Sequence, residues 1–598
     1  MQKQKYSVNQ HPIETVLNWV KSGEIAIPEI QRPFVWDSTK VRDLLDSLYQ
    51  GFPIGYLISW KNPSVRLKDG KTSEGKKVLI DGQQRVTALT AAVLGQLVVN
   101  KEYKKQRIQI AFHPLNEKFE VTNSAIEKSS EWLKDIALVL AYDADIYSLV
   151  EQYISSNPAT DRTLLFRRIE DLRKVTQRPI GIIELEADLD IETVTEIFIR
   201  INSKGVVLSQ ADFAMSKIAA NEAYGGHLLR KCIDYFCHLA KAPEFFGQLE
   251  EADHEFKTTD YFPKISWLRH ENDDLYDPDY SDLLRVAFTS EFGRGRLSDL
   301  VSLLSGRNFE KKTFEDEIVQ QSFDGLRRGV MNFINETHFK RFVMIIKSAG
   351  FIESGLISSR NALNFAYILY LRLRSQAHPD NEIERYVRRW FVMSLLTQAY
   401  SGSAESQFDT DIRFVSENGI AEAMRMGEES LLSSAYWNSG LPQQLTSSNI
   451  NNPAFSVYLA AQCKFNAKGF LSRDITIREL ITHRGDIHHL FPSDYLKRDG
   501  HSRGTYNQVA NYVYTQAEIN IRIGNKSPKA YFSGLLEQCD GGPLKYGGID
   551  SLNELSANLR ENDIPERISG DEIASYSAFL EERRHLMALK IKRYYQSL

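Results

Sequence analysis

The 598-residue chain has few cysteines and no long apolar run, and each shortage excludes a class of protein. Its four cysteines are too few and too scattered for a disulfide framework or a Cys-x-x-Cys zinc site: Cys232, Cys237, Cys463 and Cys539. No segment approaches the ~20 apolar residues that a membrane helix needs. The N-terminus also lacks the apolar run of a signal peptide. We therefore expect a cytoplasmic protein with reduced thiols and no membrane partner.

The chain also lacks an overall basic charge. Its formal net charge is −5, with 42% hydrophobic and 25% charged residues, as in ordinary globular proteins. Any surface for nucleic acid must therefore be local. Residues 464–529 contain eleven Lys and Arg against six Asp and Glu. This local excess is compatible with DNA binding, but a solvated basic face would have the same composition. The length itself indicates several domains.

Two adjacent histidines lie within this basic region. The stretch reads Gly-Asp-Ile-His-His-Leu-Phe-Pro over residues 485–492. On a short strand, alternation places Asp486 and His488 on one face and His489 on the other. One imidazole can then bind a metal while its neighbour handles a proton. Taken alone, the pair is better explained as two histidines at a strand end that are satisfied by backbone partners.

The residues that follow favour a functional interpretation. Residues 512–514 suit a second strand. Thr515 and Glu518 have the spacing of a capping box, which predicts a helix over residues 516–524 with a closing glycine. Asn520 then lies in the second turn, close enough to return to the histidine strand. The predicted order is strand, loop, strand and helix.

This arrangement resembles the ββα-metal, or HNH, nuclease motif in its divergent His-x-x-Pro form. The resemblance implies that His489 is the general base and that His488 and Asn520 hold a divalent metal, with Asp486 as a further candidate ligand. Mg²⁺ or Mn²⁺ is expected. Many relatives have an acid where this chain has His488, so a softer metal is an alternative. Asn511 is expected to act through positioning, and Asn525 competes with Asn520 for the metal.

A second motif lies near the N-terminus. A buried-type strand is predicted at 78–80, a turn at 81–85 and an apolar helix at 86–94. A glycine turn before a helix N-terminus presents backbone N–H groups to an anion. A generic strand–turn–helix joint would use the same residues. The nearby Gly70-Lys71-Thr72 is not a phosphate loop, because the required glycine five places before Gly70 is Val65.

The surrounding residues resemble the ParB/Srx-like fold of the GmrSD-type, modification-dependent (type IV) restriction enzymes, whose signature is Asp-Gly-Gln-Gln-Arg. That family couples nucleoside triphosphate binding and hydrolysis to the sensing of modified DNA. The resemblance implies a nucleotide site formed by Asp81, Gly82, Gln83, Gln84, Arg85, Gln31, Arg32, Arg200, Asn202 and Lys204. From chemistry alone, Asn202 could simply shape a turn and Arg200 could pair with a carboxylate.

The rest of the chain fits a multidomain α+β protein. Helices are predicted at 13–20 and 41–48, a strand at 56–60 and a hairpin at 108–121, before a largely helical middle. The expected domains are 1–220 (ParB/Srx-like, nucleotide-binding and DNA-sensing), 221–445 (helical scaffold) and 446–598 (HNH-like nuclease in a helical surround). A terminal helix is expected at 571–595, with most of its basic residues solvated: Arg583, Arg584, Lys590, Lys592 and Arg593.

Together these features predict a nucleotide-regulated, metal-dependent DNA endonuclease for antiphage defence. Its expected partners are DNA, especially modified phage DNA, and a nucleotide, and a second copy of the chain is a further candidate. One alternative is a ParB-like nucleotide switch that binds DNA without cutting it, although such a switch would not need His489, His488 and Asn520. An RNA-directed nuclease is another, although no RNA-binding module is recognisable.

Overall fold

The structure, a computed structural model, describes residues 5–26, 37–61, 77–99, 105–186, 189, 209–271, 273, 275–483 and 485–598. The chain folds into two compact units. The first is formed by Met1–Tyr235, Ala242–Pro263 and Leu300–Phe323, and the second by Phe236–Lys241, Lys264–Asp299 and Asp324–Leu598. The division into three domains stays a prediction.

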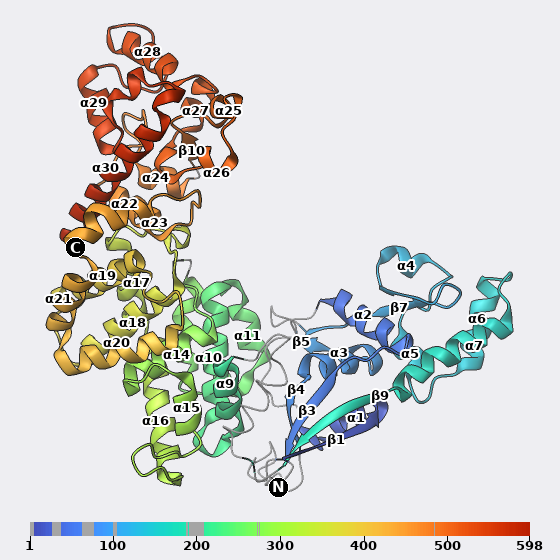
Figure 1. The fold of residues 1–598 in the computed structure, drawn as a ribbon. Coiled ribbons are helices and arrows are strands. Elements are labelled where there is room, and N and C mark those ends of the chain that lie inside the picture. Colours follow the sequence, from blue (N-terminus) through green and yellow to red (C-terminus); the bar gives the residue numbers. More distant parts are fainter. Residues whose placement is uncertain are drawn as a thin grey trace. The chain divides into compact units, whose positions relative to one another are not determined.

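A five-stranded mixed sheet runs through the first unit (Figure 1), in the order β1-β9-β3-β4-β2. β1 pairs antiparallel with β9, and β3 with β4, whereas β3–β9 and β2–β4 are parallel. β9 thus inserts between strands that precede it by more than a hundred residues. The strands are β1 (Tyr6–Pro12), β2 (Ile25–Ala26), β3 (Tyr56–Lys61), β4 (Lys77–Asp81) and β9 (Pro179–Leu185).

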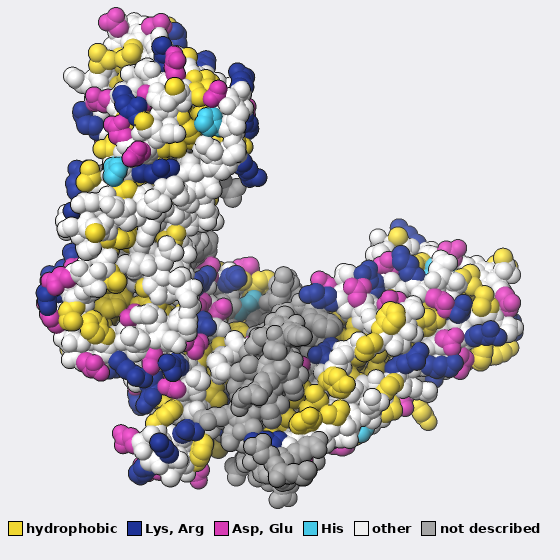
Figure 2. Space-filling view, viewed as in Figure 1, with side chains coloured by type: hydrophobic (Ala, Val, Ile, Leu, Met, Phe, Trp, Pro, Cys, Tyr) yellow, Lys and Arg dark blue, Asp and Glu magenta, His cyan; other side chains and the backbone are white. Residues whose placement is uncertain are grey.

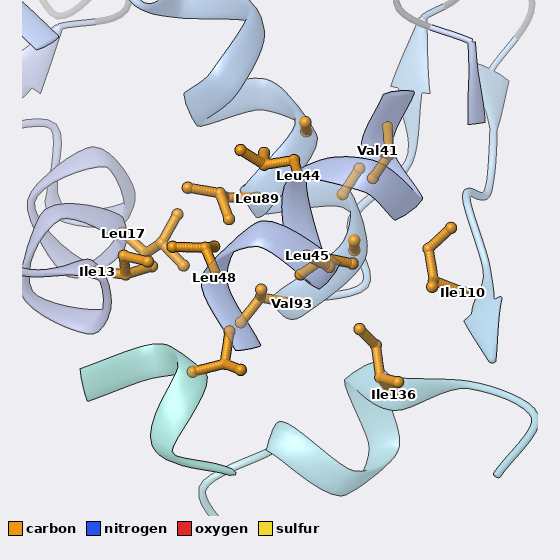
Figure 3. Packing of buried hydrophobic residues seen from close by; sticks show 14 of the residues in the cluster. Ile13, Leu17, Val41, Leu44, Leu45, Leu48, Leu89, Val93, Ile110 and Ile136 are labelled. Carbon is orange, nitrogen blue, oxygen red and sulfur yellow. The ribbon is translucent and has the colours of Figure 1, made fainter. Parts of the chain in front are cut away.

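Three helices share a core with this sheet: α1 (Ile13–Ser22), α2 (Ser38–Tyr49) and α3 (Gln83–Val93). Apolar residues at helical spacing give α2 one buried stripe, which includes Leu44, Leu45 and Leu48. Figure 3 shows Leu48 beside Ile13 and Leu17 of α1. Burial of these side chains fixes α3, and therefore the Asp81–Arg85 segment at its start.

Small elements complete the first unit. The predicted hairpin is confirmed, since β7 (Ile110–His113) pairs antiparallel with β8 (Lys118–Val121). A second short pair joins β5 (Val98–Val99) and β6 (Lys105–Gln106). Helices follow at α4 (Ser124–Lys128), α5 (Ile136–Leu140), α6 (Ile146–Ser156), α7 (Arg162–Arg173) and α9 (Gln210–Ala220). Ser209 caps α9 in a capping box with Asp212.

The middle of the chain is helical, as predicted. Its helices are α10 (Gly226–Lys241), α11 (Phe246–Ala252), α12 (His254–Lys257), α13 (Phe262–Ile265), α14 (Tyr280–Phe292), α15 (Leu297–Leu303), α16 (Asp316–Phe333), α17 (Glu336–Ser348), α18 (Arg360–Ser375), α19 (Asp380–Thr397), α20 (Ala404–Asn418), α21 (Ile420–Leu431) and α22 (Leu441–Gln444). Within the second unit, α18 packs against α14 and α19 and is buried along most of its length. A π-helical turn, η6 (Tyr436–Gly440), leads into α22.

The C-terminal part surrounds a two-stranded hairpin, β10 (Asp486–His489) with β11 (Tyr512–Thr515), with helices (Figure 1). These helices are α23 (Pro453–Lys464), α24 (Ile477–Thr482), α25 (Ser493–Arg498), α26 (Arg503–Tyr506), α27 (Ala517–Ile523), α28 (Pro528–Cys539), α29 (Leu552–Glu561) and α30 (Tyr576–Gln596). On the face shown in Figure 2, basic and acidic side chains are interspersed over this part.

The mixed α+β class is confirmed, but three local predictions are wrong. Thr515 does not cap a helix: it ends β11, its hydroxyl donates to the Phe470 carbonyl, and Gln516 is the N-cap of α27. Helix α3 begins at Gln83, so only Gly82 forms the joint after β4. On α30, Arg583 and Lys590 are buried, because backbone carbonyls and Asp563 provide partners for their charges.

Candidate functional site

The strand–strand–helix unit brings three polar side chains together. His488 Nδ1 lies 2.6 Å from Asn520 Oδ1, and Asn520 Nδ2 donates to Asp486 Oδ2 at 3.0 Å. β11 runs antiparallel to β10, and α27 starts two residues after β11 ends, so its second turn passes over β10. The sequence placed Asp486 and His488 on one face of the strand and Asn520 on a helix near it, and the structure joins the three by hydrogen bonds.

His488 lies in an apolar environment. Its side chain is buried, its ring stacks parallel to Phe470, and its Nε2 atom is buried without a hydrogen-bond partner. Burial lowers the pKa of His488 to about 4; the hydrogen bond to Asn520 opposes this effect, and the charge of His489 adds to it. The imidazole is therefore neutral near pH 7, which is the form that binds a metal ion.

The donor set fits a divalent metal. Asp486, His488 and Asn520 provide a carboxylate, an imidazole and an amide, which are ligand types of such an ion. Here the amide oxygen accepts from His488 Nδ1, so that nitrogen carries the proton of the neutral ring and the lone pair lies on Nε2. A metal bound by both side chains would replace this hydrogen bond. Within the described ranges, no three His, Cys, Asp or Glu side chains gather as a metal-binding group. A metal at β10 would thus include an amide ligand.

His489 points to the other face of β10. Its Nε2 lies 2.9 Å from Asn507 Oδ1, and its ring meets Tyr512 edge-on at 5.0 Å. The amide oxygen is an acceptor, so Nε2 carries the proton and Nδ1 carries the lone pair. Burial lowers the pKa of His489, while Asn507 opposes the shift and Lys497 adds to it. Nδ1 is therefore a free base near neutral pH.

Two buried side chains hold the loop that contains Asn507. Asn511 accepts a hydrogen bond from Phe491 N and donates to the carbonyls of Phe491 and Tyr506. Arg583 of α30, with 0% of its surface exposed, donates to the carbonyls of Ala510 and Tyr512. These hydrogen bonds fix the end of β10 and the start of β11, and therefore the positions of His488 and His489. Asn525, the other asparagine considered as a metal ligand, is exposed and hydrogen-bonds with Asp494.

The sequence did not reveal Asn507 or Arg583 as part of this site. Asn507 lies eighteen residues after His489, in a polar loop with no periodic signal. Arg583 is separated from Ala510 by seventy-three residues. One sequence feature pointed to Arg583. It lies on the apolar stripe of the terminal helix, where a charged side chain must have buried partners.

The Asp81–Arg85 segment has its own geometry in the first unit. Gly82 adopts φ 91°, and a Cβ there would lie 2.3 Å from Leu57 Cδ2. Gln83 donates from its side chain to Leu79 O at 3.1 Å. Arg85 donates to Tyr56 O at 2.7 Å and pairs with Asp81 at 3.4 Å. Arg85 therefore ties α3 to the start of β3.

The other residues predicted for a nucleotide site lie outside the described residues: Gln31, Arg32, Arg200, Asn202 and Lys204. Gln84 is half-buried in the first turn of α3. The structure thus brings Asp81, Gly82 and Arg85 together at the junction of β4 and α3, at the N-terminal end of a helix. Backbone N–H groups at such a position favour an anion.

Comparison with known proteins places the N-terminal part. Residues 13–219 match the family model described as GmrSD restriction endonuclease, N-terminal domain. This match supports the predicted relationship to that family and suggests a restriction-endonuclease function, hence a nuclease that acts on DNA. The chain is also 22% identical to the uncharacterized protein MJ0686 from Methanocaldococcus jannaschii, over 97% of this chain and 98% of that protein. No helix in the described ranges is long and apolar enough to span a membrane.

Proposed function

We propose that the chain is a nucleotide-regulated, divalent-metal-dependent DNA endonuclease of the HNH type that restricts foreign DNA, modified phage DNA in particular. One observation carries the proposal. A single four-residue strand presents His489 on one face and the linked set of Asp486, His488 and Asn520 on the other. Phosphodiester hydrolysis needs a base and a cation site, and residues of this one strand supply candidates for both. The N-terminal match supports a restriction role.

In the proposed reaction, His489 accepts a proton at Nδ1 from a water molecule. The water oxygen forms a bond to phosphorus while the bond from phosphorus to the leaving sugar oxygen breaks, and that oxygen takes up a proton from solvent. Asn507 holds the Nε2–H of His489 and stabilises the imidazolium as it forms. A divalent metal held by His488, Asn520 and Asp486 would act as Lewis acid on the phosphate and the leaving oxygen.

The N-terminal part would supply regulation. The proposed nucleotide site comprises the segment Asp81–Arg85 with Gln31, Arg32, Arg200, Asn202 and Lys204. The start of α3 supports this role through its backbone N–H groups, whereas the space that a Cβ on Gly82 would need is filled by Leu57. Control requires that nucleotide favour one of two global states and that only one of them cut DNA.

The overall function is tested by cleavage of modified and unmodified phage DNA, with and without each nucleoside triphosphate and each divalent metal. We expect cutting only with metal, a preference for modified DNA and a change on adding nucleotide. Triphosphate hydrolysis is measured on the same preparations, together with an Arg85→Ala variant. Loss of hydrolysis with normal, nucleotide-responsive cleavage would show that the two parts are uncoupled. Absence of cleavage in every combination would contradict the endonuclease assignment.

A further inference from the structure

A hollow of about 400 Å³ lies between α30 and the η6–α22 segment. Four of its lining residues come from one face of α30, at spacings of four, three and one residue: Ser577, Glu581, Arg584 and His585. The facing wall carries hydroxyl and amide groups, including Ser439 and Gln443. Hollows of this size accommodate small ligands or part of a larger one.

Arg584 gives the hollow its charge. Its guanidinium is half-buried, and its Nε–H is buried without a hydrogen-bond partner. This atom has almost no accessible surface, so a ligand in the hollow meets other atoms of the Arg584 side chain. Glu581 lies one turn away but is exposed, so water screens its carboxylate more than it screens Arg584.

The opposite wall contains an unusual backbone element. Residues Tyr436–Gly440 form a single π-helical turn, and Ser439 lies within it. π-helical turns are rare and occur mostly at functional sites, because the widened turn is less stable than α-helix. Here the turn aims exposed hydroxyl and amide groups of Ser439 and Asn438 into the hollow. These groups could satisfy the remaining oxygens of an anion.

Arg584 also connects the hollow to the candidate nuclease centre. Its second terminal nitrogen donates to Gln508 Oε1 at 2.9 Å, and Gln508 donates in turn to the Gly504 carbonyl. Gln508 directly follows Asn507, whose amide oxygen lies against His489. Whatever binds Arg584 thus acts on the loop that orients the general base.

We propose that this hollow binds a phosphate group of the DNA strand, away from the bond that is cut. The inference rests on the proposed function for its choice of DNA. An arginine side chain beside hydroxyl and amide groups suits a phosphate monoanion better than it suits a cation or an apolar group. A free nucleotide offers the same phosphate chemistry, so the experiment must separate the two sources.

The test measures binding of a short fluorescein-labelled DNA duplex to the full-length protein in EDTA, across a range of salt concentrations. Arg584→Ala should weaken binding about tenfold and lower the salt slope by about one. Ser439→Glu, at an exposed position, should have a similar effect by repulsion without threatening the fold. Arg593→Ala, an exposed arginine on the same helix, is the matched control and should bind as the wild type does.

ATP and GTP binding are measured on the same variants. Lost nucleotide binding with unchanged DNA binding would overturn the assignment to DNA. Unchanged DNA affinity and salt slope in both Arg584→Ala and Ser439→Glu would overturn the site itself. Because EDTA prevents cutting, this result is independent of the proposed catalysis: a chain that binds DNA through Arg584 but never cleaves it would contradict the endonuclease assignment and leave the phosphate site intact.

Discussion

Replacement of Asn507 tests how the general base is oriented. Asn507→Leu keeps the side-chain volume but removes the oxygen that lies 2.9 Å from His489 Nε2. That hydrogen bond gains strength when His489 takes a proton and becomes cationic, and hydrogen bonds to charged groups contribute about 1.5–3 kcal/mol. Since both side chains are half-buried, we take the lower part of this range. The cleavage rate should fall roughly 10- to 30-fold.

The matched variant is Asn507→Asp, which retains an oxygen acceptor of the same size. It should keep most of the wild-type kcat, because a carboxylate also holds the Nε2–H of His489. Single-turnover cleavage with saturating DNA separates kcat from binding, and DNA affinity should be unchanged in Asn507→Leu. Both side chains lie near the surface, so thermal unfolding should shift little. Wild-type rates in Asn507→Leu, or equal losses in both variants, would refute the positioning role.

Three further predictions concern the two units separately. Asn520→Ala should abolish divalent-metal binding by calorimetry, whereas Asn525→Ala should bind metal normally; the reverse result would show that Asn525 is the ligand. Arg583→Met should lower the free energy of unfolding by about 3 kcal/mol or more, because buried carbonyls lose their donors, while Arg593→Ala changes it by less than ~0.5 kcal/mol. Gly82→Ala should destabilise the first unit by roughly 1–3 kcal/mol, because Gly82 has a positive φ and Leu57 lies close to it. Thermal unfolding measures this loss, and an unchanged melting temperature would contradict the geometry.

Local pattern was enough to predict the elements that carry the candidate site. Alternation along Asp486–His489 gave the correct faces, because a strand has a period of two whatever surrounds it. The apolar spacing of α2 and of the helical middle was equally informative. Gly524 ends α27 at positive φ, as its position after the helix indicated.

Contacts between distant segments could not be predicted in this way. Thr515 has the right spacing for a cap, but the carbonyl of Phe470, forty-five residues away, takes its hydroxyl. Arg583 looks like a surface residue of a basic helix until the carbonyls of Ala510 and Tyr512 are brought to it. In both cases tertiary contacts overrode a local preference, and only the place of Arg583 on the apolar stripe of α30 pointed to its burial.

The central claim is that His489 is the base of a DNA-cutting centre. The most direct measurement compares cleavage of modified phage DNA by the wild type and by His489→Ala, with metal present and with DNA binding and thermal unfolding recorded for both. The account predicts that cleavage falls by at least ~10²–10⁴-fold, while DNA affinity and the melting temperature stay close to those of the wild type. Cleavage by His489→Ala at near wild-type rate would contradict it.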